Sequence, residues 1–385
     1  MIKCNSRKKK IFSILITILL FAFVLSLIFV GIFNPSSIEN TKKRYNHHVQ
    51  KLKAPKQLSN SLNTTSKIKE YDIEPLTIIC LPYPVMTNRL RDRYLISMSS
   101  WLLTSNTTKI MILMPPYEFD PNLILLPLLE SLFGKNRILF GPSLETDEDG
   151  VPYIDEWFIK GLDSVTASSS SSSELLCWIN ADIITPNGWL QRVSYLYDYF
   201  IKKRNRQISV ISRRCDFDIS DDATTEFFNE VDTYAKTKSN NIWPPDFDKI
   251  AGNRKLHSTW GIDFFLVSKE PKQINFDEIP PFHLGKYRWD PWITGWLRKN
   301  MPLITLGDDF CTYHLNHVPK GREMDDIKVK ENFEEARRRG NYKVPNGLAS
   351  FYLRGRYLYE KGKDEPLDKI YESIPLANAP DEKEN

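Results

Sequence analysis

The feature that most constrains the fold is the apolar stretch 175–184, Leu-Leu-Cys-Trp-Ile-Asn-Ala-Asp-Ile-Ile, which carries one carboxylate at Asp182. A short apolar run bounded by turn residues predicts a buried strand of a parallel sheet. An unpaired carboxylate is unfavourable there, so Asp182 must have a partner, bind a metal ion, or lie where the strand meets a cleft. Because open α/β sheets bind ligands at the carboxyl ends of their strands, we expect a functional site at Asp182.

The flanking regions alternate between strand-like and helix-like patterns, which predicts βαβ units and a mostly parallel sheet flanked by helices. Strands are expected at 76–81, 109–114, 137–140, 207–212, 261–267 and 303–306, and the segment 310–317 follows the last of them. Helices are expected at 92–103, 122–133, 155–162, 188–203 and 293–299. The segment 216–257 breaks this pattern and is expected to be a long connection, of the kind that forms lids or substrate walls. No Gly-x-Gly-x-x-Gly or Walker loop follows the first strand, which argues against a dinucleotide or P-loop site.

The N-terminal region contains the uncharged apolar segment 11–33, which is preceded by a basic cluster at 7–10. About 23 residues span roughly 35 Å as a helix, enough to cross a bilayer. The positive-inside rule then leaves the N-terminus in the cytosol. A cleaved signal peptide is the alternative, but the apolar run is too long for one and no small-x-small site closes it. We therefore expect an uncleaved signal anchor that leaves the rest of the chain lumenal.

The expected domain plan has five parts. They are a cytosolic tail (1–10), a transmembrane segment (11–33), a flexible stem rich in Ser, Asn, Lys and Thr (34–74), an α/β domain (75–320) and a charged, helical C-terminal extension (321–385). Within the extension, helices are expected at 325–339 and 350–360. A charged run of this kind is usually a solvated face, so no chemistry is assigned to it.

Other features bear on the compartment and on the class of partner. Sequons for N-glycosylation begin at Asn63 and Asn106, in agreement with a lumenal location. Four cysteines of the lumenal part permit three pairings, and buried free thiols remain equally open: Cys80, Cys177, Cys215 and Cys311. The net charge of +4 is slight, and zinc-finger spacing, an RNP-like strand and a concentrated basic face are all absent from the sequence. Nucleic acid is therefore not an expected partner.

Three features of the sequence could form one site. Asp182 follows a central strand, Asp290 precedes Pro291 at the start of a helix, and His314 and His317 follow the last strand. Carboxylate and imidazole groups suit Mn²⁺ or Mg²⁺ that bridges a diphosphate. Asp290 is expected to be a helix N-cap, and such a carboxylate can accept a proton from a hydroxyl group. Taken singly, Asp290 also reads as a mere helix cap and each histidine as a structural residue.

The order of these motifs resembles that of the GT-A-fold nucleotide-diphospho-sugar glycosyltransferases, over about 74–318. Leu-Cys-Trp-Ile-Asn-Ala-Asp at 176–182 resembles a strand that ends in an Asp-x-Asp metal motif. Three further segments resemble a little-characterised subgroup of such proteins: Trp-Gly-Ile-Asp-Phe-Phe-Leu-Val, Ile-Pro-Pro-Phe-His-Leu-Gly and Arg-Trp-Asp-Pro-Trp. At the corresponding places the subgroup reads Gly-x-Asp-Tyr-Phe, Pro-Pro-Phe-x-x-Gly and Trp-Asp-Asn-Trp-Leu, followed by His-Gln-Asn-His. The resemblance implies a GT-A-like (Rossmann-like) fold. It also implies a Golgi-type enzyme that moves a sugar from a nucleotide donor to an acceptor hydroxyl group. Together with the signal anchor, this predicts a single-pass type II protein of the Golgi (or ER) membrane that acts on a glycan, protein or lipid acceptor.

The resemblance also implies roles for individual residues. Asp182 would hold Mn²⁺ (or Mg²⁺) on the donor diphosphate, and His314 or His317 would be the last metal ligand. Asp290 would be the general base of an inverting reaction. The remaining residues with implied roles are Asn180, Tyr83 and Arg91 on the donor side, and Asp263 and Trp260 on the acceptor side. From the residues alone, Asp263 also reads as a buried, hydrogen-bonded acid.

The chain departs from the family pattern at Asn180, which stands at the first acidic position of the metal motif. An amide brings no charge, so metal affinity would be weakened or metal use abandoned. This departure motivates an alternative, a catalytically inactive lumenal carbohydrate-binding or scaffolding protein with the same fold. A metal-dependent hydrolase, the third class, needs a denser cluster of ligands than six histidines in 385 residues readily supply.

Overall fold

The computed structural model describes residues 75–82, 88–103, 105–114, 125–168, 173–237, 245–269, 274–307, 309–316, 326–340, 345 and 348–369. These residues belong to one compact unit, 68–385. The predicted transmembrane segment 11–33 and the stem 34–74 lie outside them. Within the part of the chain that the structure describes, no helix has the length and apolar character needed to cross a membrane.

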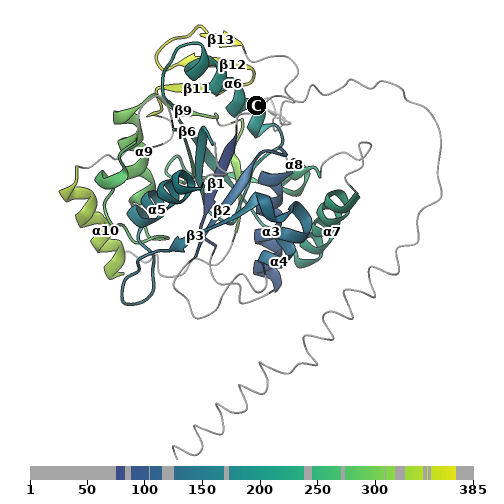
Figure 1. Ribbon diagram of the computed structural model, residues 1–385. Coiled ribbons are helices and arrows are strands. Elements are labelled where there is room, and N and C mark those ends of the chain that lie inside the picture. Colours follow the sequence, from purple (N-terminus) through teal and green to yellow (C-terminus); the bar gives the residue numbers. More distant parts are fainter. Residues whose placement is uncertain are drawn as a thin grey trace, which may run out of the picture. The chain divides into compact units, whose positions relative to one another are not determined.

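A mixed, mostly parallel sheet forms the centre of the unit (Figure 1). Its strand order is β13-β12-β11-β9-β6-β8-β4-β1-β2-β3. The strands are β1 (Leu76–Cys80), β2 (Lys109–Met114), β3 (Ile138–Ser143), β4 (Leu175–Ile179), β6 (Ser209–Phe217), β8 (Ile262–Ser268), β9 (Leu303–Thr305), β11 (Phe351–Arg354), β12 (Tyr357–Glu360) and β13 (Asp368–Lys369). β8 is antiparallel to both β4 and β6. Consequently β4 and β6 run in the same direction, and their carboxyl ends lie at the edge of the sheet where β8 begins.

The second half of β6 continues beyond the main sheet, where three short strands gather. These are β5 (Ile183–Ile184), β7 (Lys255–Leu256) and β10 (Thr312–Leu315). β7 and β10 pair with β6, and β10 in turn pairs with β5. β10 runs parallel to β6, with His314 opposite Asp216, and antiparallel to β5, with His314 opposite Ile183. This pairing brings together segments that follow the ends of β4 and β6.

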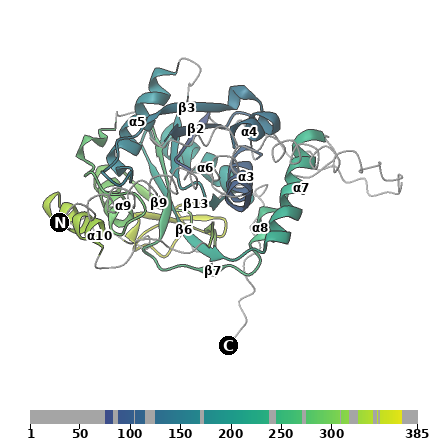
Figure 2. The ribbon, with the colours of Figure 1, turned by 90° about the horizontal axis from the view of Figure 1, so that it is seen from below.

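Helices cover both faces of the sheet, as Figure 2 shows from below. One face packs against α3 (Asn88–Leu102), α4 (Leu126–Phe133) and α6 (Trp189–Tyr197). The other packs against α5 (Ile154–Ala167) and α9 (Trp289–Asn300). Further helices are α7 (Asp221–Thr237), which packs against α3, the short α8 (Phe247–Ile250) and α10 (Ile327–Arg338).

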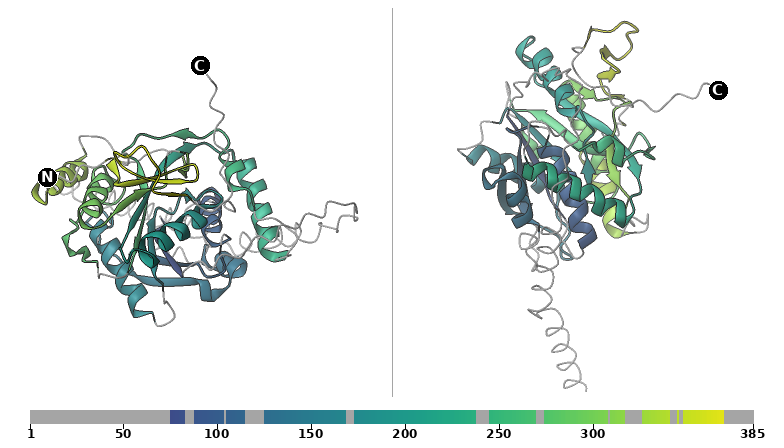
Figure 3. Two further views of the ribbon diagram at one scale, coloured as in Figure 1. Left: turned by 90° about the horizontal axis from the view of Figure 1, so that it is seen from above. Right: turned by 90° about the vertical axis from the view of Figure 1, so that its right-hand side faces the viewer.

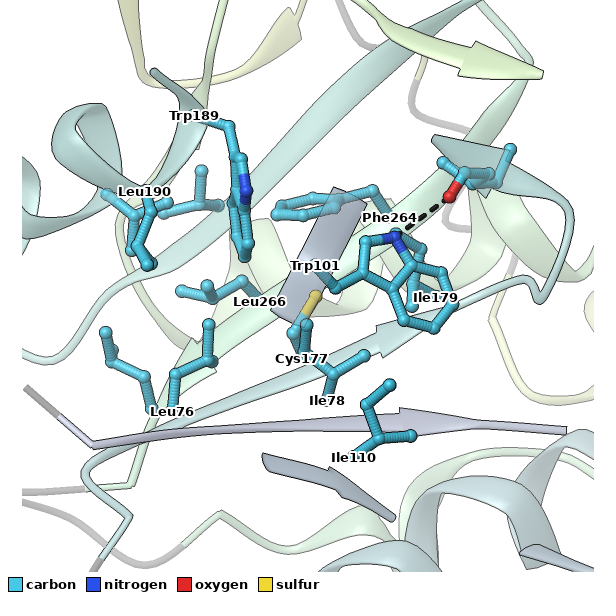
Figure 4. Close-up of a cluster of buried hydrophobic side chains, with 14 of the residues drawn as sticks. Leu76, Ile78, Trp101, Ile110, Cys177, Ile179, Trp189, Leu190, Phe264 and Leu266 are labelled. Carbon is cyan, nitrogen blue, oxygen red and sulfur yellow. Dashed lines mark hydrogen bonds between the residues drawn. The ribbon is translucent and has the colours of Figure 1, made fainter. Parts of the chain in front are cut away.

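The continuous apolar character of β4 follows from burial on both faces. Cys177 and Ile179 point into the cluster that Figure 4 shows, together with Trp101 and Phe264. Trp178 points the other way and stacks on Phe158 of α5, with 4.9 Å between ring centroids. A strand buried on both faces has no polar alternation, which explains why the stretch 175–179 reads as an unbroken apolar run.

The structure confirms the alternating strands and helices and the helix expected within 325–339, and it corrects two predictions. The segment 350–360 is not a helix: it forms the strands β11 and β12, which continue the sheet beyond β9 (Figure 3, yellow). Its charged composition suggested an exposed helix, but Phe351 and Leu353 alternate toward the core, and Gly355, with φ of +55°, makes the turn. The segment 216–257 is also not wholly irregular, because it contains α7.

Candidate active site

The polar residues predicted to form a site meet at the edge of the sheet where β4 and β6 end. Asp182 lies in the turn between β4 and β5, Asp263 at the start of β8, Asp290 in the first turn of α9, and His314 in β10. Three residues that the sequence analysis did not select join them. We call the whole set the edge cluster: Asp182, Arg214, Asp216, His257, Asp263, Asp290 and His314.

Asp182 and His314 face each other, and their metal-binding roles stay predictions. Oδ2 of Asp182 lies 3.5 Å from Nε2 of His314. The backbone holds the two segments together, because the Leu315 N–H donates to the carbonyl oxygen of Asp182 at 3.3 Å. Burial alone would lower the pKa of His314, but Asp182 and Asp216 act in the opposite direction more strongly and raise it to about 9. The site thus favours positive charge at the position between these carboxylates.

Asp216 connects three side chains of the edge cluster. Its Oδ1 lies 3.1 Å from Nδ1 of His314 and 3.1 Å from Nε of Arg214. Its Oδ2 accepts a hydrogen bond of 2.5 Å from Nδ1 of His257. Burial would raise the pKa of Asp216, yet the hydrogen bonds from the two histidines and the charge of Arg214 hold it well below its usual range. Asp216 is therefore ionised throughout the physiological pH range.

Asn180 and Asp263 bind each other. Nδ2 of Asn180 donates to Oδ1 of Asp263 at 2.9 Å, and Nη1 of Arg214 donates to Oδ2 at 2.9 Å. The Asn180 N–H also donates to the carbonyl oxygen of Asp263 at 3.2 Å. Both carboxylate oxygens of Asp263 are engaged, which agrees with the buried, hydrogen-bonded acid considered from the sequence. The donor role of Asn180 and the acceptor role of Asp263 stay predictions.

Asp290 is not the N-cap of its helix. α9 begins at Trp289, and its N-cap is Arg288, which has a left-handed backbone with φ of 93°. Pro291 is compatible with this position too, since the first N–H groups of a helix have no intrahelical acceptor. Oδ2 of Asp290 accepts a hydrogen bond of 3.4 Å from the N–H of Ile262. Burial, and then the charge of Asp263, raise the pKa of Asp290 to about 8, which is suited to a general base.

The other predicted residues are placed in different surroundings. Trp260, just before β8, is 41% exposed. Arg91 on α3 pairs with its neighbour Asp92 at 2.7 Å. Tyr83 and His317 lie outside the described residues.

Arg93 on α3 is a residue that the sequence analysis missed. It is buried, its Nη1 donates to the carbonyl oxygen of Asn316 at 2.9 Å, and the negative charge of Asp182 acts on it. Burial lowers the pKa of Arg93, and nearby carboxylates, including Asp182, oppose that effect. Arg91 and Arg93 look equivalent in the sequence, and the phase of α3 decides which of them turns inward.

Of the four cysteines, two form a disulfide and two are free thiols, so both alternatives considered from the sequence occur. Cys215 and Cys311 form a disulfide, with 5.7 Å between their Cα atoms. Cys80 and Cys177 are buried free thiols. Because Cys215 lies between Arg214 and Asp216, and Cys311 immediately precedes β10, the disulfide attaches the strand that carries His314 to the strand that carries Asp216.

Asp182 and His314 fit a divalent metal ion as a pair. Ligands at about 2.1 Å from one octahedral ion lie roughly 3 Å apart, and the two atoms are 3.5 Å apart. Among the described residues no group of three or more His, Cys, Asp or Glu side chains could hold a metal ion. The remaining positions would be filled by phosphate oxygens and water, as is usual for Mg²⁺ beside nucleotide phosphates.

Comparisons with known proteins give a distant match in structure alone. No family model and no curated protein matches the chain. A solved mannosyltransferase from Pyrobaculum calidifontis, in complex with GDP-Man and Mn²⁺, matches with a TM-score of 0.39 and 13% identity, over 81% of this chain and 75% of that one. Glucosyl-3-phosphoglycerate synthase from Mycobacterium tuberculosis matches with a TM-score of 0.33 and 11% identity, over 71% and 82%. Matches at these values assign no role to the edge cluster.

Proposed function

We propose that the chain is a metal-assisted, inverting glycosyltransferase that moves a sugar from a nucleotide-diphosphate donor to an acceptor hydroxyl group. One observation carries the proposal: the edge cluster combines a carboxylate–imidazole pair, Asp182 and His314, with a carboxyl group of raised pKa, Asp290. The first two provide ligands for a cation, and the third provides a base. The motif-level resemblance to the GT-A-fold subgroup supports the same reading.

The chemistry divides between the two parts of the cluster. Asp182 and His314 would hold Mn²⁺ or Mg²⁺, which when bound neutralises charge on the departing diphosphate. Asp290 would accept the proton of the acceptor hydroxyl group while the oxygen of that hydroxyl group forms a bond to the anomeric carbon. The bond from that carbon to the diphosphate oxygen breaks on the opposite face, so the configuration inverts. Arg93, a cation close to Asp182, would add to the stabilisation of the diphosphate.

The same proposal places the enzyme in the secretory pathway, as a single-pass type II protein of the Golgi or ER with segment 11–33 as its anchor. The disulfide between Cys215 and Cys311 supports an oxidising compartment. Asn106, the first residue of a sequon, is exposed and therefore accessible to a glycan. Loss of one glycan from Asn106→Gln, seen as a shift that glycosidase treatment also produces, would test the lumenal location.

A turnover assay tests the function. Purified protein is supplied with a panel of UDP- and GDP-sugars, with Mn²⁺ or with a chelator, and release of the nucleoside diphosphate is measured. We expect turnover with one donor that depends on the metal and is lost in Asp182→Ala and Asp290→Ala. Asp364→Ala, which changes an exposed carboxylate away from the edge cluster, is the matched control. Full activity in both cluster variants would refute the proposed roles.

The alternative function is a lumenal carbohydrate-binding or scaffolding protein without catalysis. The contact of Asn180 with Asp263 favours it, since the first position of the metal motif is uncharged and its amide binds a neighbouring strand. This alternative predicts that UDP and GDP with Mn²⁺ leave the thermal unfolding temperature unchanged. A rise at saturating nucleotide would exclude it.

A further inference from the structure

We propose that Asp216 is a positioning residue, which orients the ring of His314 so that Nε2 faces the metal position beside Asp182. The inference rests on the proposed function, because it concerns the metal ion that the transfer reaction would use. Asp216 would not itself bind the metal ion. Its action would pass through His314.

The contacts of His314 determine which of its nitrogens can bind a metal ion. Oδ1 of Asp216 lies 3.1 Å from Nδ1 of His314, and a carboxylate beside a ring nitrogen favours a proton on that nitrogen. In the neutral ring the lone pair then lies on Nε2, the nitrogen that faces Asp182 at 3.5 Å. A metal-binding histidine commonly donates its other N–H to a carboxylate, which fixes both the tautomer and the orientation of the ring.

Asp216 is itself held by two other side chains. Arg214 lies 3.1 Å from its Oδ1, and His257 donates to its Oδ2 at 2.5 Å. Nε2 of His257 lies 3.4 Å from Nη2 of Arg214. Since a guanidinium group only donates, His257 accepts there and carries its proton on Nδ1. The carboxylate is thus restrained from both sides and cannot rotate away from His314 without breaking these contacts.

The backbone places the ring opposite the carboxylate. In the parallel pairing of β6 with β10, His314 is the direct partner of Asp216, and Tyr313 is the partner of Cys215. The disulfide between Cys215 and Cys311 holds the two strands together at the start of this pairing. Strand register and the disulfide therefore fix the distance, and Asp216 selects the nitrogen.

Binding of Mn²⁺ alone, measured by the electron spin resonance signal of the unbound ion, tests the inference without any sugar donor. In Asp216→Asn the amide keeps the shape of the carboxylate but loses its charge, and we expect Mn²⁺ affinity to fall by about 10- to 100-fold. Asp364→Asn, the exposed control, should bind like the wild type. Wild-type affinity in a folded Asp216→Asn protein, or a wild-type protein that binds no Mn²⁺, would overturn the proposal.

A second measurement needs no variant at position 216. In the ¹⁵N-histidine NMR spectrum of the wild-type protein, assigned with His314→Gln, we expect a protonated Nδ1 and a shift of Nε2 on addition of Cd²⁺, a diamagnetic probe. A shift of Nδ1, or of neither nitrogen, would overturn the inference. If Asp216→Asn binds Mn²⁺ normally while the wild type transfers sugar, the inference alone fails. If the wild type turns over no sugar nucleotide but both metal results hold, the proposed function alone fails.

Discussion

Two buried histidines of this chain each lie between two carboxylates, and they differ in what completes their surroundings. His314 lies between Asp182 and Asp216 in the edge cluster. His283 lies between Asp147, 3.1 Å from its Nδ1, and Glu331, 2.8 Å from its Nε2. In the second cluster Lys328 contacts both Asp147 and Asp149, the latter at 2.8 Å.

The difference separates a structural network from a candidate reaction site. Lys328 and Glu331 belong to α10, and Asn332 of the same helix donates to the carbonyl oxygen of His283 at 3.1 Å. Lys328 thus supplies a cation to Asp147 and Asp149, as Arg214 does to Asp216 and Asp263, but the His283 network also attaches α10 to the rest of the unit. The edge cluster has similar groups at the carboxyl ends of strands, where open α/β sheets bind ligands. We therefore propose that similar side chains serve a structural purpose around His283 and a chemical one around His314.

The largest effect is expected at Asp290. Asp290→Asn removes the base while keeping its shape, and turnover should fall by about 10²- to 10⁴-fold. A neutral residue also suits this buried position, so the variant should be at least as stable as the wild type at pH 8. A turnover assay would measure the loss of activity, and thermal unfolding would measure the stability of the variant. If Asp290→Asn keeps its activity, another residue of the edge cluster must be the general base.

Removal of the Lys328 ammonium group tests whether the His283 cluster is structural. Lys328→Met removes the ammonium group from Asp147 and from the exposed Asp149, while Nδ1 of His283 remains beside Asp147. Loss of a hydrogen bond to a charged group costs about 1.5 to 3 kcal/mol. Turnover per folded molecule should be unchanged, because the His283 cluster takes no part in the reaction. Urea unfolding would show the loss, with Asp364→Asn, an exposed carboxylate whose replacement should change stability by no more than about 0.5 kcal/mol, as the control variant. Equal stability of Lys328→Met and the wild type would contradict the structural reading of that cluster.

The pH profile of turnover gives a third test. The pKa of Asp290 is raised to about 8, so the fraction of the basic form, and with it kcat/KM, should rise about tenfold per pH unit below 8 and level off above it. The stability of the folded state should depend on pH in the opposite direction from turnover. A carboxyl group with a raised folded pKa favours the folded state most below its unfolded pKa of about 4, and this contribution is lost as the pH rises toward 8. The stability gap between Asp290→Asn and the wild type should therefore widen with pH; a constant gap would contradict the burial of this group.

The sequence predicted the parts of the site that follow recognisable strands and missed those that depend on pairing. Asp182, Asp263 and His314 were found because each interrupts or follows an apolar run. Asp216 was missed because the strand was expected to end at residue 212, whereas β6 continues to Phe217 by pairing with β10. That pairing joins segments about a hundred residues apart, as the disulfide separation of 96 residues shows. The local pattern of apolar residues cannot indicate a contact between segments so far apart in the sequence.

The smallest expected effect concerns the support of Asp216 by His257. A Cβ atom at Gly261 would lie 2.3 Å from Cδ2 of His257 and 3.1 Å from Nε of Arg214. Gly261→Ala should therefore displace the His257 ring from Asp216 and shift Nε of Arg214 by a few tenths of an ångström, while the strand pairing still holds the carboxylate. We expect Mn²⁺ affinity to fall by no more than about threefold, well below the change for Asp216 itself.

Gly252→Ala is the matched control for this last test, since its Cβ would meet only the carbonyl oxygen of Lys249, at 3.4 Å. NMR of the His257 ring would establish its displacement, and Mn²⁺ titration would measure the consequence. A loss as large as that of Asp216→Asn would mean that His257, rather than strand register, keeps the carboxylate in place. The edge cluster would then depend on a side chain from the connection after β7, and its geometry would be sensitive to every change in that connection.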